Sequence, residues 1–206
     1  MPAVGRAAGR GRGLAPAGRR RPAYAAVVPT PLPGAGSRLG LVLAGEVLVA
    51  IDLVGDHVPL RAPPPHGVAA EAAGQLAAYF ADPTFVFELP LETGGTPYQR
   101  CVWQSLSRLP PGATETYGAL ARAAGGSARS VGHACRSNPL PIVIPCHRVV
   151  AATGLGGYMG TRLPADRSRT EPSPEGEGRI AANTDPLSVK RWLLAHEGAR
   201  FAGALR

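Results

Sequence analysis

The stretch from position 141 to 150, PIVIPCHRVV, constrains the fold more than any other, because a proline interrupts an apolar run immediately before a cysteine. Pro145 fixes its own φ and steers the residue before it away from the helical region. The run is therefore predicted to be extended and to present Cys146 at a strand-like end. His147 and Arg148 follow the thiol, and basic neighbours of this kind lower a thiol pKa. The pattern makes Cys146 a candidate nucleophile.

A chain of 206 residues is long enough for one or two compact domains with a real core. Its three cysteines show neither Cys-x-x-Cys spacing nor histidine pairs at zinc-ligand spacing, so we expect no metal and a reducing cytosol. No apolar run of membrane-spanning length occurs, and the Arg-rich N-terminus lacks the apolar region of a secretory signal. The sequence thus predicts a cytoplasmic protein without a membrane partner.

The net charge of +8 is distributed unevenly. Six of the 22 basic residues lie in the first 21 positions, and without them 16 basic residues face 14 acidic ones. Residues 97–160 are different, because they hold six arginines and a single acidic residue, Glu115. This local excess predicts a cationic surface that suits nucleic acid, although a solvated arginine face is the alternative.

The first half of the chain is predicted to form a small α/β domain at residues 37–93, after a disordered tail at 1–36. The tail is rich in Gly, Ala, Arg and Pro and has almost nothing to bury. Two strands joined by a tight turn are expected between Leu39 and Leu53, followed by a helix over 68–80. Alternating apolar residues predict a further strand over 85–89.

The second half, residues 97–206, is predicted to be a mainly helical domain after a Gly-rich linker. Two short helices, 117–124 and 128–136, are separated by Gly-Gly and suggest a helix-turn-helix, although such pairs also occur in ordinary cores. The polar, proline-containing segment 161–186 is predicted to be a disordered insertion. A final helix is expected over 187–196.

Cys146, His147 and Glu197 supply a thiol, a base and a group that could orient the base. Neighbouring residues on a strand face opposite ways, so a water between the thiol and the imidazole is an alternative to direct contact. Two further readings stay open on chemistry alone. Cys146 could be a buried structural cysteine, or the nucleophile of a thiol hydrolase.

The string IPCHRVV at 144–150 resembles the signature of the O6-alkylguanine-DNA alkyltransferases, also called methylated-DNA–protein-cysteine methyltransferases. The resemblance covers about residues 80–160 and 187–198, including TYG at 116–118, ARSVG at 128–132 and the final helix with Glu197. It implies a small ribonuclease-H-like antiparallel sheet with a helix, followed by a winged-helix-like domain with a helix-turn-helix. The tail and the segment 161–186 fall outside it.

The resemblance implies repair of O6-alkylguanine, and of O4-alkylthymine, by a single irreversible transfer of the alkyl group to Cys146. His147, oriented by Glu197, would take the thiol proton through water, and Asn138 would hold the active loop. Tyr117 would help guanine leave as a neutral base. No cofactor is implied, and the protein would act as a monomer on double-stranded DNA, from the minor groove.

The family resemblance also implies two sets of contacts. Arg129 would enter the duplex and replace the flipped nucleotide. Residues expected at the DNA are Arg129, Ala128, Ser130, Gly132, Arg136 and Thr116. Residues expected at the flipped base are Tyr117, Val149, Tyr158 and Met159. Met159 departs from the small polar residue that the family often has there, which affects the shape of the pocket. A related class of lesion-binding proteins without transfer is the alternative, but it lacks the acceptor cysteine.

Overall fold

The computed structural model describes residues 23–34, 38–159 and 185–201. A three-stranded antiparallel sheet forms its N-terminal part, in the order β1 (Ala26–Pro29), β2 (Arg38–Ala44) and β3 (Val47–Val54). The predicted tight turn between β2 and β3 is confirmed, with Gly45 at a φ of 62° that a residue with a side chain rarely adopts. The helix α1 (Val68–Ala81) packs against all three strands.

Strand β1 corrects the prediction of a disordered tail that extended to residue 36. It pairs with β2 over its whole length, from Ala26 opposite Leu41 to Pro29 opposite Arg38. Residues 1–22 and 35–37 lie outside the described residues. The sequence did not predict this strand, because its four residues are too few for a local pattern and it is a strand only through its pairing with β2.

The predicted strand over 85–89 is wrong. These residues form no regular element, and Glu88 bonds through its backbone N–H and carbonyl to the side chain of Gln75 in α1, at 2.8 Å each. The segment reaches the sheet only afterwards, where Leu48 N donates to Pro90 O at 2.9 Å. The alternation of apolar residues instead places Phe85 and Phe87 against the core.

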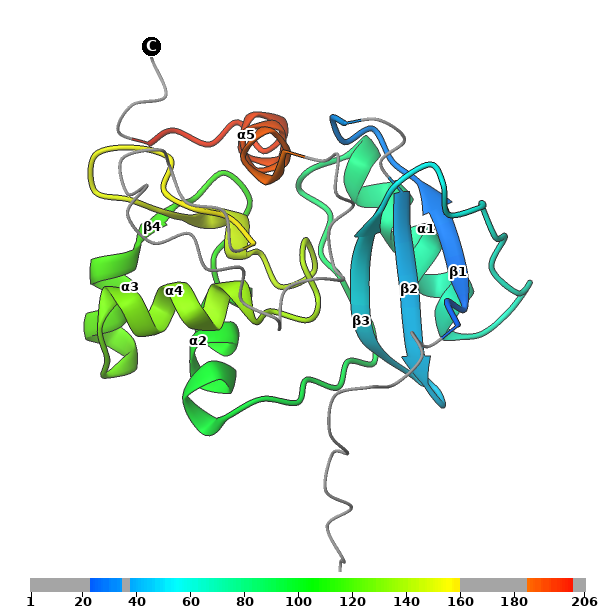
Figure 1. Cartoon of the computed structure of the whole chain (residues 1–206), viewed down its shortest axis with the longest axis horizontal. Helices are drawn as coiled ribbons and strands as arrows, with labels where there is room; N and C mark the ends of the chain where they lie inside the picture. The colour runs from blue at the N-terminus through cyan, green and yellow to red at the C-terminus, as the bar shows by residue number, and fades with distance from the viewer. Residues whose placement is uncertain (1–22, 35–37, 160–184, 202–206) are drawn as a thin grey trace, which may run out of the picture.

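Helices dominate the chain from Pro97 onward (Figure 1). They are α2 (Pro97–Ser107), α3 (Tyr117–Ala124), α4 (Ala128–Arg136) and α5 (Pro186–His196). Capping explains where they begin: Thr116 Oγ1 accepts from Ala119 N at 3.1 Å, and Ser127 forms a capping box with Ser130. The predicted helices are confirmed, and α3 ends at the left-handed Gly125.

The acceptor loop differs from the predicted extended run. Ile142 has a φ of 75°, which is strained for a β-branched residue, and Cys146–Arg148 form a 3-10 helix, η1, rather than a strand end. Strand β5 (Val149–Val150) follows and pairs in parallel with β4 (Glu115–Thr116). The turn at Ile142 brings Cys146 back toward Asn138.

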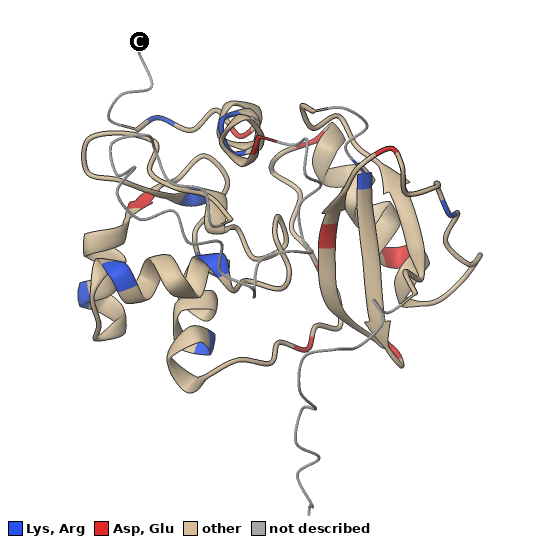
Figure 2. Cartoon of the chain, viewed as in Figure 1, with Lys and Arg blue, Asp and Glu red and all other residues tan. Residues whose placement is uncertain are grey.

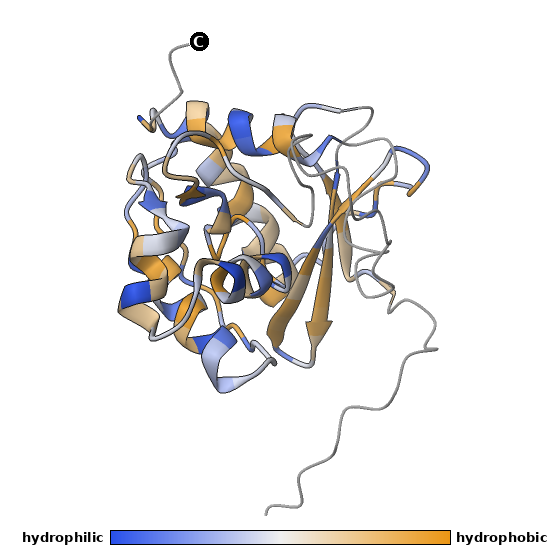
Figure 3. Cartoon of the chain, turned by 60° about the vertical axis from the view of Figure 1, so that its left-hand side comes forward, coloured by the Kyte–Doolittle hydropathy of each residue, from blue (hydrophilic) through white to orange (hydrophobic). Residues whose placement is uncertain are grey.

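One apolar cluster joins the sheet, α1 and the helices. Figure 3 shows apolar residues along the strands and on parts of the helices. In Figure 1, α5 lies at the top between the helical part and the sheet. Its C-terminal end contacts both, because Glu197 bonds to Tyr79 of α1 and to His147. Within the described ranges, none of the helices combines the length and apolar character needed to cross a bilayer.

Candidate functional site

The sulfur of Cys146 is held inside a closed turn. Asn138 Nδ2 donates to Cys146 Sγ at 3.2 Å and to Ile144 O at 2.8 Å, and its Oδ1 accepts from Leu140 N at 3.0 Å. One buried amide therefore ties both sides of the loop and reaches the thiol. From the sheet, Ile51 N donates to the carbonyl of Pro139 at 2.9 Å and supports the same turn. These bonds stabilise the strained conformation that presents Cys146.

His147 is fully buried and bonds through Nε2 to Glu197 Oε1 at 2.9 Å. An ionised carboxylate can only accept, so Nε2 carries the proton of the neutral ring and Nδ1 carries a lone pair. Burial lowers the pKa of His147 below 6.5, against the opposing influence of Glu197, so the ring is neutral near pH 7. Nδ1 is buried and finds no hydrogen-bond partner among the described residues. This nitrogen has the character of a base.

Glu197, the C-cap of α5, accepts hydrogen bonds from several directions. Arg148 donates to Oε1 at 2.7 Å and to Oε2 at 2.9 Å, and Gly112 N donates to Oε2 at 3.3 Å. Tyr79 in α1 donates to Oε1 at 2.8 Å. Burial opposes ionisation, but the hydrogen bonds from His147 and Arg148 and the positive charge of Arg148 outweigh it and hold the pKa of Glu197 well below its usual range.

Lys190 fastens the loop that follows the acceptor. It is fully buried, and its Nζ donates to the carbonyls of Val149, Leu155 and Gly157 at 2.6, 2.7 and 2.9 Å. Burial lowers the pKa of Lys190 to about 8. Because three donors meet three carbonyls, the ammonium is matched by its surroundings. The loop geometry therefore depends on α5.

Tyr117 lies on the other side of this loop. Its hydroxyl donates to Gly157 O at 3.1 Å, and its ring centroid lies 5.9 Å from the nitrogen of Lys190. Burial raises the pKa of Tyr117 well above its usual value, so the hydroxyl keeps its proton near pH 7. Among the other residues expected at the base, Val149 and Tyr158 are buried and Met159 is half-buried at a φ of 46°. Tyr158 also stays protonated, because burial raises its pKa.

The residues expected at DNA lie on and beside α4. Ala128, Arg129 and Arg136 are exposed, whereas Ser130 and Gly132 are half-buried. Thr116 caps α3 at the neighbouring helix start. Figure 2 shows basic positions gathered on α2, α3 and α4, with most acidic positions elsewhere. The structure therefore places a cationic helical surface next to, but distinct from, the buried acceptor.

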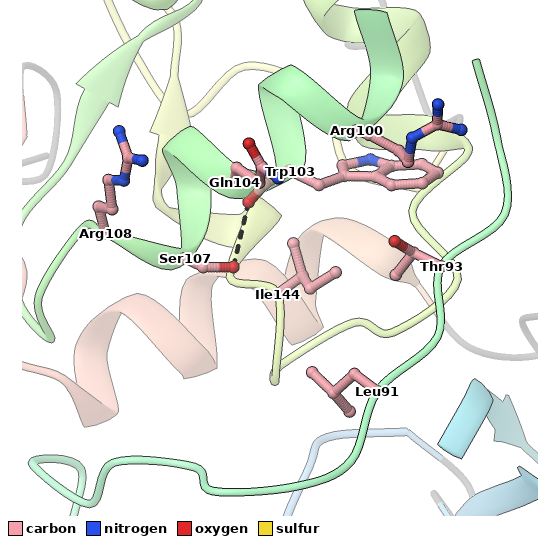
Figure 4. Close-up of a pocket in the computed structure, with 8 residues that line it drawn as sticks. All are labelled: Leu91, Thr93, Arg100, Trp103, Gln104, Ser107, Arg108 and Ile144. Atoms are coloured by element: carbon pink, nitrogen blue, oxygen red, sulfur yellow. Dashed lines mark hydrogen bonds between the residues drawn. The ribbon is translucent and has the colours of Figure 1, made fainter. Parts of the chain in front are cut away.

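A separate hollow of about 460 Å³ runs along α2 and does not reach the acceptor (Figure 4). Trp103 and Ile144 lie on its apolar side, and Arg100 and Arg108 stand at opposite ends. None of Cys146, His147 and Glu197 lines it. Elsewhere in the described chain, no three His, Cys, Asp or Glu side chains gather closely enough to hold a metal ion.

Sequence reasoning missed Tyr79 and Lys190, and treated Arg148 only as a charge near the thiol. Lys190 offered a signal, because Leu193 and Leu194, three and four residues later, put this only lysine of the chain on an apolar helix face. The sequence around Arg148 held no signal that identified Glu197 as its partner. Tyr79 gave none either, since its place on the apolar face of α1 predicts burial of the ring and says nothing about the hydroxyl.

The buried Glu197 network predicts loss of stability in acid. Because the pKa of Glu197 is depressed in the folded state, its contribution is fully present above the unfolded value of 4.5 and is lost as the pH falls below it. The lowered pKa of His147 acts in the same direction, since unfolding releases a ring that takes up a proton below pH 6.5.

We expect Glu197→Gln to lower the free energy of unfolding by about 3 kcal/mol at pH 7, because it leaves Arg148 buried without a countercharge. Urea unfolding should show this difference narrowing at about pH 4 and below. The exposed Glu88→Gln is the matched control and should change stability little at any pH. A Glu197→Gln difference that stays constant in acid would contradict the assigned ionisation.

Comparisons with known proteins identify the relatives of this chain. Residues 97–172 match the family model of the 6-O-methylguanine DNA methyltransferase DNA binding domain. A methylated-DNA–protein-cysteine methyltransferase of Mycobacterium leprae is 44% identical over 128 residues, which span 58% of this chain and 78% of the relative. A constitutive enzyme of the same name from Bacillus subtilis is 46% identical over 96 residues, 45% of this chain and 58% of the relative.

Solved structures extend the likeness to the N-terminal part. The crystal structure of the Mycobacterium tuberculosis O6-methylguanine methyltransferase has a TM-score of 0.61 at 30% identity and covers 86% of this chain and 93% of its own. The Mycobacterium tuberculosis OGT in complex with DNA has a TM-score of 0.59 at 30% identity, covering 87% and 95%. The motif, the fold and this coverage together show that the chain belongs to the methylated-DNA–protein-cysteine methyltransferase family.

Proposed function

We propose that the protein repairs O6-alkylguanine in DNA, and O4-alkylthymine as well, by transferring the alkyl group once and irreversibly to Cys146. The observation that carries this proposal is the arrangement around the sulfur. Asn138 donates a hydrogen bond to Cys146 Sγ at 3.2 Å. His147, which follows Cys146 in the chain, is held by Glu197 through the ring nitrogen that carries the proton. A thiol, a base and an orienting carboxylate are the parts that a cysteine nucleophile requires.

Activation of the thiol removes its proton through the base. The proton passes from Cys146 by way of a water to Nδ1 of His147, and the resulting imidazolium is stabilised by Glu197 at 2.9 Å. Asn138 Nδ2 donates to the sulfur and stabilises its negative charge. Lys190 adds a positive charge that acts on Cys146.

Transfer then proceeds by displacement at the alkyl carbon. A Cys146 sulfur electron pair forms the S–C bond while the C–O6 bond breaks and its electrons move into guanine. Tyr117, which keeps its proton at neutral pH, donates it to the guanine ring so that the base leaves neutral. His147 gains one proton, from Cys146, and Tyr117 loses one proton, to guanine, so the net charge of the site does not change during the transfer. A thioether has no leaving group for hydrolysis, so each molecule acts once.

The substrate must leave the base stack to reach the acceptor, because the alkylated atom is inaccessible in a duplex and Cys146 is 2% exposed. We assign the opening of the duplex to Arg129, the second residue of α4, which enters from the minor groove and fills the vacated space. Small neighbours such as Ala128 and Gly132 permit close approach. The helices α3 and α4 form a helix-turn-helix in this proposal.

The remaining organisation follows from the same reading. The protein acts as a monomer in the cytoplasm, with the N-terminal domain predicted at 37–93 extended back to include β1, and a winged-helix-like domain at 97–206. The N-terminal domain is ribonuclease-H-like. The proposed insertion at 161–186 lies almost entirely outside the described residues, and we propose that it leaves the site intact. In support, α5 resumes at Pro186 and brings Glu197 to within 2.9 Å of His147.

Transfer is tested by incubation with duplex DNA that carries O6-methylguanine, followed by mass mapping. We expect a gain of one methyl group on the peptide that contains Cys146, at one equivalent per protein. Cys146→Ala should abolish the gain while DNA binding remains. Cys101→Ala, which removes an exposed thiol outside the site, should leave transfer unchanged. Tight binding without transfer would point to a lesion-binding protein, and repeated release of product would point to a hydrolase.

The role of Arg129 is tested by comparing two substrates. Arg129→Ala should slow transfer from duplex DNA by about tenfold or more, because unstacking a base costs a few kcal/mol. Transfer from free O6-benzylguanine should change by less than about twofold, since no stack has to be opened. Arg191→Ala, which removes an equal charge from the exposed surface of α5, is the control. Equal losses on both substrates for Arg129→Ala would remove its assigned role.

A further inference from the structure

One residue of α1 bonds to both residues at the C-terminal end of α5. The hydroxyl of Tyr79 donates to Glu197 Oε1 at 2.8 Å, and its backbone carbonyl accepts from His196 Nε2 at 2.9 Å. The two rings of Tyr79 and His196 meet edge to face, with centroids 5.4 Å apart. Tyr79 therefore fixes the segment that delivers Glu197 to His147, from the opposite part of the chain.

Three donors converge on the same oxygen of that carboxylate. Glu197 Oε1 accepts from Tyr79 at 2.8 Å, from His147 at 2.9 Å and from Arg148 at 2.7 Å. A carboxylate oxygen has a limited number of lone-pair directions, so donors on one oxygen share its electron density. The hydrogen bond from Tyr79 therefore weakens the hydrogen bond that the same oxygen accepts from His147.

The hydroxyl of Tyr79 is a fixed and permanent donor. Tyr79 is fully buried, and its ring packs against Phe80 and Phe87 with centroids 5.5 Å away in each case. Burial, and then the negative charge of Glu197, raise the pKa of Tyr79 far above its usual value. It therefore keeps its proton at every pH at which the acceptor would operate. Ring packing alone would be satisfied by phenylalanine, so the hydroxyl calls for a separate explanation.

We propose that Tyr79 is a positioning residue for the acceptor site, whose hydroxyl holds Glu197 in place and limits how strongly that carboxylate attracts the proton of His147. The inference rests on the proposed function of His147 as the base for Cys146. The N-terminal part of the chain then has two roles, because it contributes to the core and also sets how readily His147 is protonated.

The tuning has a definite direction. An imidazole bonded to a stronger acceptor is more easily protonated, and a protonated His147 cannot take the proton of Cys146. By drawing charge from Oε1, Tyr79 keeps His147 neutral to lower pH. Removal of the hydroxyl should therefore raise the pKa of His147 and shift the acid side of the rate profile to higher pH.

The other charged groups near His147 and Tyr79 do not change when the Tyr79 hydroxyl is removed. Glu197, Arg148 and Lys190 are close enough to His147 to interact with it electrostatically. Tyr79 faces Glu197 and Arg148 from the acceptor side and His196 from α5. Tyr79→Phe removes one neutral donor and leaves each of these charges in place. A shift in His147 can then be assigned to the lost hydrogen bond.

Tyr158, buried close enough to interact electrostatically with both Tyr79 and Glu197, is a further titratable neighbour. Its own pKa is raised by burial, so it stays neutral through the pH range of the titration. It therefore contributes no change of charge that could imitate the loss of the Tyr79 hydroxyl.

The test is an NMR titration of the histidine rings in the free full-length protein, with His147→Gln identifying the His147 signal. We expect Tyr79→Phe to raise the pKa of His147 by about half a pH unit or more, with the acid side of the transfer rate moving equally. Tyr24→Phe removes another tyrosine hydroxyl that bonds a carboxylate, that of Asp52, and should shift neither. An unchanged or lowered pKa of His147 in folded Tyr79→Phe would overturn the inference.

A double variant separates positioning from general packing. In a Glu197→Gln background, Tyr79→Phe should produce no further shift, because its effect passes through the carboxylate. A shift of undiminished size would contradict that route. The titration requires no DNA, so its outcome is independent of alkyl transfer. A wild-type protein that fails to transfer the alkyl group would contradict the proposed function. A wild-type protein that transfers it, together with an unchanged pKa of His147 in Tyr79→Phe, would contradict only the inference about Tyr79.

Discussion

The buried carboxylate of Glu197 is the interaction on which the rest of the site depends. It receives donors from η1, from α1 and from the turn at Gly112. Isolated in a core, such a charge would be very costly, and here positive charge and hydrogen bonds offset that cost. The segments that contribute these donors are consequently fixed relative to one another.

This arrangement links stability and chemistry in one place. Arg148 neutralises Glu197, Glu197 orients His147, and Asn138 holds the sulfur from the opposite side. The exposed basic surface of α4 requires no such network, because Arg129 and Arg136 are exposed to solvent. The protein therefore separates a rigid buried acceptor from a surface that meets the polyanion, and a flipped base connects the two in the proposed function.

Much of the fold could be predicted from local signals. Thr116 and Gly125 mark the two ends of α3, and Gly45 marks the turn of the hairpin, because caps and left-handed turns depend on a few adjacent residues. Strand β1 and the segment 85–89 were mispredicted for the opposite reason. A short extended segment becomes a strand only if a partner is present, and for residues 85–89 the side chain of Gln75 takes that place.

The candidate site was predictable where residue type and family resemblance named a residue, and not where a buried contact depends only on how distant segments pack. Cys146, His147 and Glu197 could be named from residue type and resemblance, and the structure places Glu197 against His147, the residue that follows Cys146. The left-handed Ile142 that returns Cys146 to Asn138 had no local signal, since a β-branched residue disfavours that conformation. Tyr79 lies 118 positions from Glu197, and nothing in an apolar helix face identifies the partner of a hydroxyl.

In the proposed function, Glu197 acts on the reaction through His147. This role is tested most directly by the single-turnover rate of methyl transfer in Glu197→Gln, His147→Gln and the double variant. If the carboxylate works by orienting and stabilising the imidazole, the double variant should be about as slow as His147→Gln alone, because the two losses are one loss. Rate losses that multiply independently in the double variant would show that Glu197 acts on the reaction by a route other than His147.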